Sequence, residues 1–132
     1  MILHHVGIVV DNLAEAIPLF KVWLGARPVG EIVEDEAQAA RIQLFLLNND
    51  TLLEVVEAIP GTDSPLHTVG EFHLCYTVPD IDAEMQRMHD MGMIVTRALG
   101  NAPLFNNQRI AFLATHSGQL LELLEDPSMA MQ

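Results

Sequence analysis

The sequence predicts an α+β fold built from two copies of a βαβββ module, and three observations lead to this prediction. The first is an internal repeat: shifting the chain by 68 residues (108 minus 40) aligns residues 40–58 with 108–126 without a gap. The second is that each copy begins with an apolar run and continues with a segment of helical periodicity. The third is that the segments 48–50 and 116–118 have hairpin-turn composition, which favours a mainly antiparallel sheet.

In the first copy, the apolar run at 2–10 predicts a strand, and the segment at about 12–23 predicts an amphipathic helix that Leu-Gly terminates. Pro18 falls inside this helix, where it should kink the helix or restart it. Three strands complete the copy, near 27–34, 41–47 and 51–58.

The second copy repeats this order, with an apolar strand at 71–78 and a helix at about 81–91 that Met-Gly terminates. Its remaining strands are expected near 93–99, 108–115 and 118–125. We expect a single domain over residues 1–132, divided into module 1 at about 1–60, a Pro- and Gly-containing linker at about 59–70, module 2 at about 71–126 and a short C-terminal tail at 127–132.

Composition and charge narrow the function. Half of the 132 residues are apolar, yet no apolar run has the length of a membrane span, and no basic segment opens a signal peptide. The net charge of −12 and only six Lys and Arg residues argue against nucleic acid and against anionic membrane surfaces. The single Cys75 cannot form an internal disulfide, so we expect a cytoplasmic protein.

Four ionisable residues fall at equivalent positions of the repeat, namely His5 and His73 on the first strands and Glu54 and Glu122 on the last strands. An ionised carboxylate in apolar surroundings is costly unless something compensates its charge. Two imidazoles and two carboxylates are suitable ligands for a divalent first-row metal ion. Taken singly, a histidine on a strand is more often structural and a glutamate is more often solvated. Their coincidence with the repeat favours a metal site.

Other residues leave two interpretations open. Arg41 and Arg109 are equivalent in the repeat and would either bind an anion or lie on a solvated strand face. Cys75 shares a strand face with His73, so it would either line a cavity or fill the core. Core filling is the default for four methionines, Met85, Met88, Met91 and Met93. A surface or loop position is expected for the four histidines without a counterpart in the repeat, His4, His67, His89 and His116.

The segment LHHVGIVVDNLAEAI, the following Leu-Gly and the glutamate-bearing strand TLLEVVE resemble the vicinal oxygen chelate superfamily over about residues 2–125. That superfamily includes glyoxalase I, methylmalonyl-CoA epimerases, extradiol dioxygenases and bleomycin-resistance proteins. The resemblance implies that the two modules pair into a curled sheet around a central cavity. It also implies a metal-ligand set of His5, Glu54, His73 and Glu122.

Within the superfamily, GTDSPL at 61–66 is similar to a segment of methylmalonyl-CoA epimerases, whereas ATHSGQ at 114–119 departs from theirs. The resemblance therefore implies a metal-dependent isomerase or epimerase that transfers a proton next to a carbonyl group, with a methylmalonyl-CoA-like acyl thioester as one candidate substrate. Glu122 is the expected base and Glu54 the second acid–base group. The expected cofactor is one divalent ion, with cobalt, nickel, zinc and manganese as candidates.

Alternatives within the superfamily remain open: a glyoxalase I-like lyase, a dioxygenase, or a non-catalytic protein of the bleomycin-resistance type that sequesters a small molecule. The expected partner is a small carbonyl compound or acyl thioester. Gln43, Arg41 and Arg109 are the candidate substrate-binding residues. We also expect a homodimer.

Overall fold

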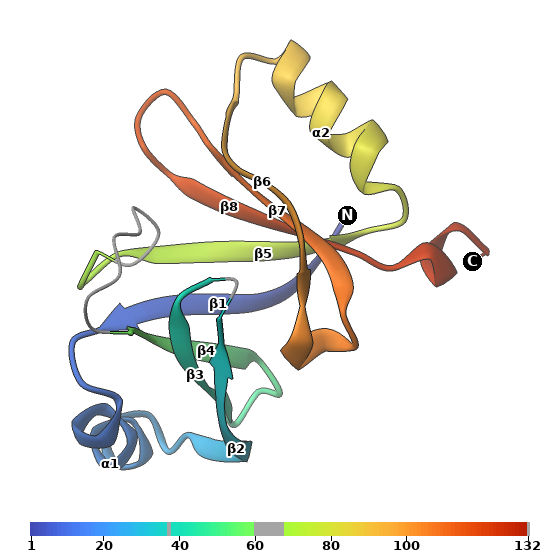
Figure 1. Ribbon diagram of the computed structural model, residues 1–132. Helices are drawn as coiled ribbons and strands as arrows, with labels where there is room; N and C mark the ends of the chain where they lie inside the picture. Colours follow the sequence, from blue (N-terminus) through green and yellow to red (C-terminus); the bar gives the residue numbers. More distant parts are fainter. Residues whose placement is uncertain (37, 60–67, 132) are drawn as a thin grey trace. The chain divides into compact units, whose positions relative to one another are not determined.

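A computed structural model describes residues 1–36, 38–59 and 68–131 of the chain. The chain forms two compact units, of which one comprises His5–Phe72 and the other comprises Met1–His4 together with His73–Gln132. The predicted α+β class is confirmed, and each unit has the predicted βαβββ order of elements (Figure 1). The unit boundary falls inside the first strand, so the first four residues belong with the second module.

The first unit contains five elements: β1 (Ile2–Val10, from His5 onward), α1 (Leu13–Leu24), β2 (Arg27–Asp35), β3 (Ala40–Leu46) and β4 (Leu52–Ala58). Its strands lie in the order β2-β3-β4-β1, and only the β1–β4 pair is parallel. Helix α1 begins where the side chain of Asn12 accepts a hydrogen bond from the Glu15 amide at 3.0 Å. It ends at Gly25, whose φ of 62° favours glycine.

The second unit repeats this arrangement with β5 (Phe72–Val78, from His73 onward), α2 (Ile81–Asp90), β6 (Ile94–Ala102), β7 (Gln108–Ala114) and β8 (Leu120–Glu125). Its strand order is β5-β8-β7-β6, again with one parallel pair, β5–β8. Two short 3₁₀ helices, Pro103–Phe105 and Pro127–Met131, were not predicted from the sequence. In both units, the helix packs on one face of its sheet, and the two apolar clusters include Phe45 and Val55 in the first and Leu113 and Leu123 in the second.

Pro18 does not restart helix α1, and that part of the prediction is wrong because the helix runs from Leu13 to Leu24 without a break. A proline inside a helix removes one backbone hydrogen bond and crowds the preceding turn. The helix buries three side chains, those of Leu13, Ala16 and Phe20. Their packing offsets the free-energy cost of the lost hydrogen bond.

The methionines and histidines without a repeat counterpart divide between core and surface. Met88 is buried in the second apolar cluster, and Met85 and Met93 pack against it, as predicted. Met91 is exposed, so the core prediction is wrong there, because this residue caps α2 beyond the buried face.

His4 also differs from its prediction. It lies on β1 and is half-buried, and its ring meets the Phe105 ring edge-on at a centroid distance of 4.8 Å. His89 and His116 are exposed as expected, whereas His67 lies outside the described residues.

Candidate metal-binding residues

In the first unit, strand pairing brings His5 to Glu54. The parallel β1–β4 ladder pairs Gly7 with Glu54, and side chains alternate along a strand, so His5 shares the face of Glu54. The Nε2 atom of His5 lies 3.4 Å from Oε2 of Glu54. Both residues are buried, with 0% and 5% of their surfaces exposed. The neighbouring histidine, His4, points to the other face. Of the two adjacent histidines, only His5 therefore lies beside Glu54.

In the second unit, the same geometry brings His73 to Glu122. The parallel β5–β8 ladder pairs Cys75 with Glu122, and His73 lies on the same face two residues earlier. The Nε2 atom of His73 lies 3.3 Å from Oε1 of Glu122, and both residues are buried. The Phe112 ring meets the His73 ring edge-on at a centroid distance of 5.5 Å. The sequence repeat therefore corresponds to a structural repeat of the His–Glu pair.

Each pair fits two ligands of a divalent ion. The separations of 3.4 Å and 3.3 Å exceed the usual range of about 2.7–3.2 Å for an N–H···O hydrogen bond. Ligands about 2.0–2.2 Å from a tetrahedral ion lie about 3.3–3.6 Å from one another. Each of the four side chains offers one ligand atom, either an imidazole nitrogen or a carboxylate oxygen. The donor chemistry and the spacing within each unit are compatible with two ligands of one metal ion.

The strand face that carries each pair is otherwise largely apolar. In the first unit, Glu54 is in register with Leu44, which in turn pairs with Val29 of β2. Val56 lies two residues beyond Glu54 on the same face and is buried. Cys75 is also fully buried and shares the face of His73 and Glu122. A low-polarity surrounding strengthens electrostatic interactions of the carboxylates with any cation that binds them.

Gln43 and Arg41 lie on the opposite face of the first sheet from Glu54. The β3–β4 register pairs Gln43 with Val55, which belongs to the apolar cluster beneath α1. The amide of Gln43 donates to the carbonyl of Leu44 at 2.8 Å and to the carbonyls of Val29 and Gly30 at 3.3 Å each. Gln43 thus holds the irregular part of β2 in place.

Arg41 lies on the same face as Gln43, and its Nε donates to Oε1 of Glu34 at 3.0 Å. One terminal nitrogen also lies 3.9 Å from Oε1 of Glu57. The guanidinium of Arg41 therefore makes ion pairs within its own module, away from the His5–Glu54 pair.

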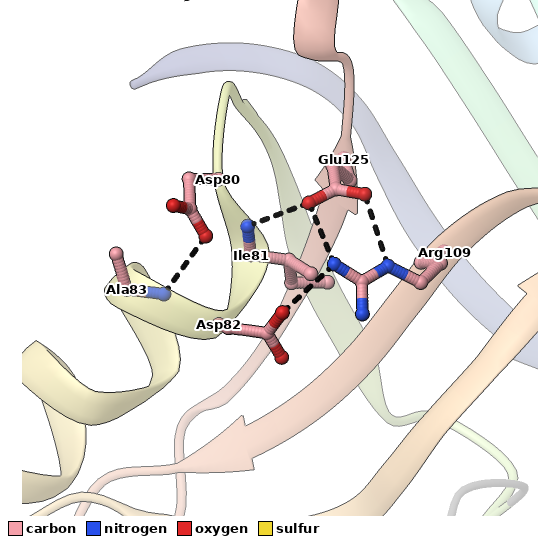
Figure 2. Close-up of polar contacts among 6 residues, drawn as sticks. All are labelled: Asp80, Ile81, Asp82, Ala83, Arg109 and Glu125. Carbon is pink, nitrogen blue, oxygen red and sulfur yellow. Dashed lines mark hydrogen bonds and ion pairs between the residues drawn. The ribbon is translucent and has the colours of Figure 1, made fainter.

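Arg109 belongs to a polar network at the start of α2, shown in Figure 2. Its Nε and one terminal nitrogen donate to the two oxygens of Glu125 at 3.0 Å and 2.9 Å, and the same terminal nitrogen donates to Asp82 at 2.9 Å. Oε2 of Glu125 also accepts the amide of Ile81 at 3.0 Å. The Arg109 hydrogen bonds, with the Ile81 amide adding to them, hold the pKa of Glu125 below its ordinary value. Glu122 pairs with Phe112 of β7 and so shares its face. Arg109 is three residues before Phe112, so it lies on the opposite face.

The comparison with known proteins places the chain in a family. A model of the glyoxalase/bleomycin resistance protein/dioxygenase superfamily matches residues 4–112, so the chain belongs to this superfamily. No curated protein sequence shows significant similarity to the chain.

Solved structures support the fold. Methylmalonyl-CoA epimerase from Mycobacterium tuberculosis is 23% identical, with 98% of this chain and 91% of that chain covered and a TM-score of 0.71. A Streptomyces coelicolor methylmalonyl-CoA epimerase variant in complex with 2-nitronate-propionyl-CoA is 18% identical, with coverage of 96% and 97% and a TM-score of 0.74. A hypothetical protein from Bacillus halodurans C-125 is 20% identical, with coverage of 94% and 93% and a TM-score of 0.75. At these identities the likeness establishes the fold.

The GTDSPL segment at 61–66 lies outside the described residues, so the structure adds nothing to that similarity. Among the described residues, no helix is long and apolar enough to cross a membrane.

Proposed function

We propose that this protein is a metal-dependent isomerase or epimerase that transfers a proton at the carbon next to a carbonyl group. The observation that carries the proposal is the buried His–Glu pair at the same position of each of the two modules. Membership of the superfamily supports it, since that superfamily's name covers glyoxalases and dioxygenases.

The residues that would hold the ion are His5, Glu54, His73 and Glu122, two from each module. Two carboxylates cancel the charge of one divalent cation, which offsets the cost of burying them. Cobalt, nickel, zinc and manganese ions all accept this mixture of nitrogen and oxygen donors. When bound, the ion supplies Lewis-acid stabilisation of the negative charge that develops on a substrate carbonyl oxygen.

The chain itself supplies the acid–base chemistry. We assign Glu122 as the base: its carboxylate takes the proton from the carbon next to the carbonyl, while the C–H electron pair moves toward the carbonyl oxygen. Glu54 is the symmetric group: once it has taken a proton from solvent, it gives that proton to the opposite face and is left as a carboxylate. Return to the same carbon yields the epimer, and return to the neighbouring carbon yields a glyoxalase-type product.

The substrate in this proposal is a small carbonyl compound or acyl thioester. The epimerases of similar fold include one in complex with methylmalonyl-CoA, which makes 2-methyl-branched acyl thioesters the first candidates. Gln43, Arg41 and Arg109 are left out of the substrate contacts, because their side chains are engaged on the faces opposite the His–Glu pairs. Dimer formation and a cytoplasmic location remain predictions.

Exchange of substrate hydrogen with solvent deuterium tests the function before the true substrate is known. Metal-loaded protein should exchange the α-hydrogen of 2-methyl-branched acyl thioesters or other 1,3-dicarbonyl compounds, whereas metal-free protein should not. Oxygen consumption with a catechol would instead favour the dioxygenase, and binding without exchange would favour the sequestering protein. Protein that binds no divalent ion after reconstitution would contradict the metal-dependent mechanism altogether.

A further inference from the structure

One arginine, which the sequence did not single out, lies on the same row of the second sheet as Glu122. The three ladders of this sheet pair Cys75 with Glu122, Glu122 with Phe112, and Phe112 with Arg97. Residues that oppose one another in a ladder point to the same face. Arg97 is therefore on the His73–Glu122 face, and it is half-buried.

The distance across this row suits a small substrate. Adjacent strands lie about 4.8 Å apart, so the backbones of Arg97 and Glu122 are about 10 Å apart, with Phe112 between them. The long side chain of Arg97 can bring its guanidinium much closer to Glu122 than the backbone distance. Register shifts on both sides of Arg97 mark irregularities in β6. Bulges of this kind often re-aim a side chain beside a site.

The first module shows that the fold does not need a cation at this position. The offset of 68 residues (97 minus 29) makes Val29 the counterpart of Arg97. Val29 pairs with Leu44, and Leu44 pairs with Glu54, so the rows are equivalent in the two modules. Only the second module carries a charge at the end of this row.

The other two arginines of the second unit lie elsewhere. Arg109 is engaged with Glu125 and Asp82 on the opposite face. Arg87 lies on α2, where one of its terminal nitrogens is 2.8 Å from Glu84. Arg97 is thus the arginine of this unit that shares the face of the His–Glu pair.

We propose that Arg97 binds a carboxylate of the substrate beside the His73–Glu122 pair. A guanidinium matches a carboxylate with two parallel hydrogen bonds, which fixes orientation as well as charge. The inference rests on the proposed function and names its substrate class: a small carbonyl compound whose own carboxylate lies a few bonds from the carbon that loses the proton. One arginine on this row matches the single charge of one carboxylate.

Binding of a non-reactive chelator tests this assignment without any turnover. Succinic monohydroxamic acid offers two vicinal oxygens to a metal ion and a carboxylate a few bonds away, and its methyl ester lacks only that negative charge. Isothermal titration calorimetry of the zinc-loaded protein should show the acid binding about 10- to 100-fold more tightly than the ester, as a charge-assisted contact predicts. R97M should reduce this preference to within about twofold, and R97K should retain part of it. R87M, which also removes one positive charge from this unit, should leave the preference unchanged.

The outcomes test the role of Arg97 separately from the proposed metal-dependent function. Equal binding of acid and ester by the wild type, or an unchanged preference in both R97M and R97K, overturns the role of Arg97 and leaves the proposed metal-dependent function standing. Failure to bind zinc, or to bind either hydroxamate when loaded, overturns the proposed function and the role of Arg97 with it. A thermal melt of each variant without ligand shows that a lost preference reflects the missing guanidinium and not an unfolded protein.

Discussion

At the scale of single residues, the burial of two glutamate carboxylates requires an explanation, because burying a charge is costly. Glu54 and Glu122 are 5% and 2% exposed, and one oxygen of each carboxylate lies 3.4 Å and 3.3 Å, respectively, from an imidazole nitrogen. A neutral histidine does not compensate a carboxylate charge. A divalent cation would compensate such a charge, and the donor atoms of these side chains could bind one.

The first prediction separates the base from the ligand. Glu122→Gln keeps the size of the side chain and an oxygen donor but cannot accept the proton. We expect deuterium exchange to fall by about 10²- to 10⁴-fold while the metal content, measured by elemental analysis, stays close to that of the wild type.

His5→Ala is the contrasting variant, because an imidazole ligand is lost without touching the assigned base. Metal affinity and exchange should then decline together. If Glu122→Gln exchanges at the wild-type rate with metal bound, Glu122 serves only as a ligand and another group is the base.

The two buried His–Glu pairs of the candidate site could be predicted from the sequence, because their four residues occupy equivalent places in the repeat. Alternation along β1 also distinguishes His5 from His4. Arg97 could not be found in this way, because its counterpart is Val29 and because register shifts in β6 decide which residue opposes Phe112. Arg41 and Arg109 also make ion pairs with Glu57 and Glu125, which are equivalent in the repeat, whereas their contacts with Glu34 and Asp82 have no counterpart in it.

At the scale of elements, α1 and α2 begin in the same way: a glutamate side chain from a strand accepts a hydrogen bond from the first amide of the helix. Glu57 accepts the Leu13 amide at 3.4 Å in the first unit, and Glu125 accepts the Ile81 amide at 3.0 Å in the second. A carboxylate at a helix N-terminus satisfies a free amide and complements the helix dipole. This explains why the two glutamates recur in the repeat.

The second prediction follows from the lowered pKa of Glu125. The folded state holds this carboxylate ionised below the ordinary value of 4.5, so its contribution to stability is fully present above that pH and is lost as the pH falls through the lower folded pKa. Arg109→Met removes the main cause of the shift, so it should lower the melting temperature at pH 7. The melting temperatures of variant and wild type should converge as the pH falls below 4.5, through the lowered pKa of Glu125. Arg87→Met, on the surface of α2, is the control. Its melting temperature relative to the wild type should not change in this way with pH.

The third prediction concerns the N-cap of α1. Asn12→Ala removes the acceptor of the Glu15 amide and should reduce the free energy of unfolding by about 0.5–2 kcal/mol. Asn12→Asp keeps an acceptor and should be close to neutral. Urea denaturation followed by circular dichroism measures both; an alanine variant as stable as the wild type would show that this cap contributes little.

Helix α1 also shows where element prediction fails. Its limits were predicted within a residue of Leu13 and Leu24, because Asn12 and Gly25 are strong start and stop signals. Pro18 does not restart the helix, because the cost of proline is local whereas Leu13, Ala16 and Phe20 are buried against β-strands distant in sequence. The 3₁₀ turn at Pro103–Phe105 has no periodicity by which a short segment could be recognised.

At the scale of the whole molecule, the last prediction tests whether the two modules share one ion. If one site uses both His–Glu pairs, the protein should bind one divalent ion per chain, and two ions would indicate that each pair works alone. His5→Ala and His73→Ala lie in different modules, so a shared site predicts that either variant weakens zinc binding to a similar extent. Separate sites predict instead that each variant loses one ion and keeps the other. Competition with a zinc-binding dye measures the stoichiometry and the affinity.

Because the ion binds the folded state, excess zinc at about 1,000 times its dissociation constant should add about 4 kcal/mol to the free energy of unfolding, and a chelator should remove this gain. Thermal melting with and without chelator measures the effect. A melting temperature that does not respond to the chelator would contradict the shared buried site.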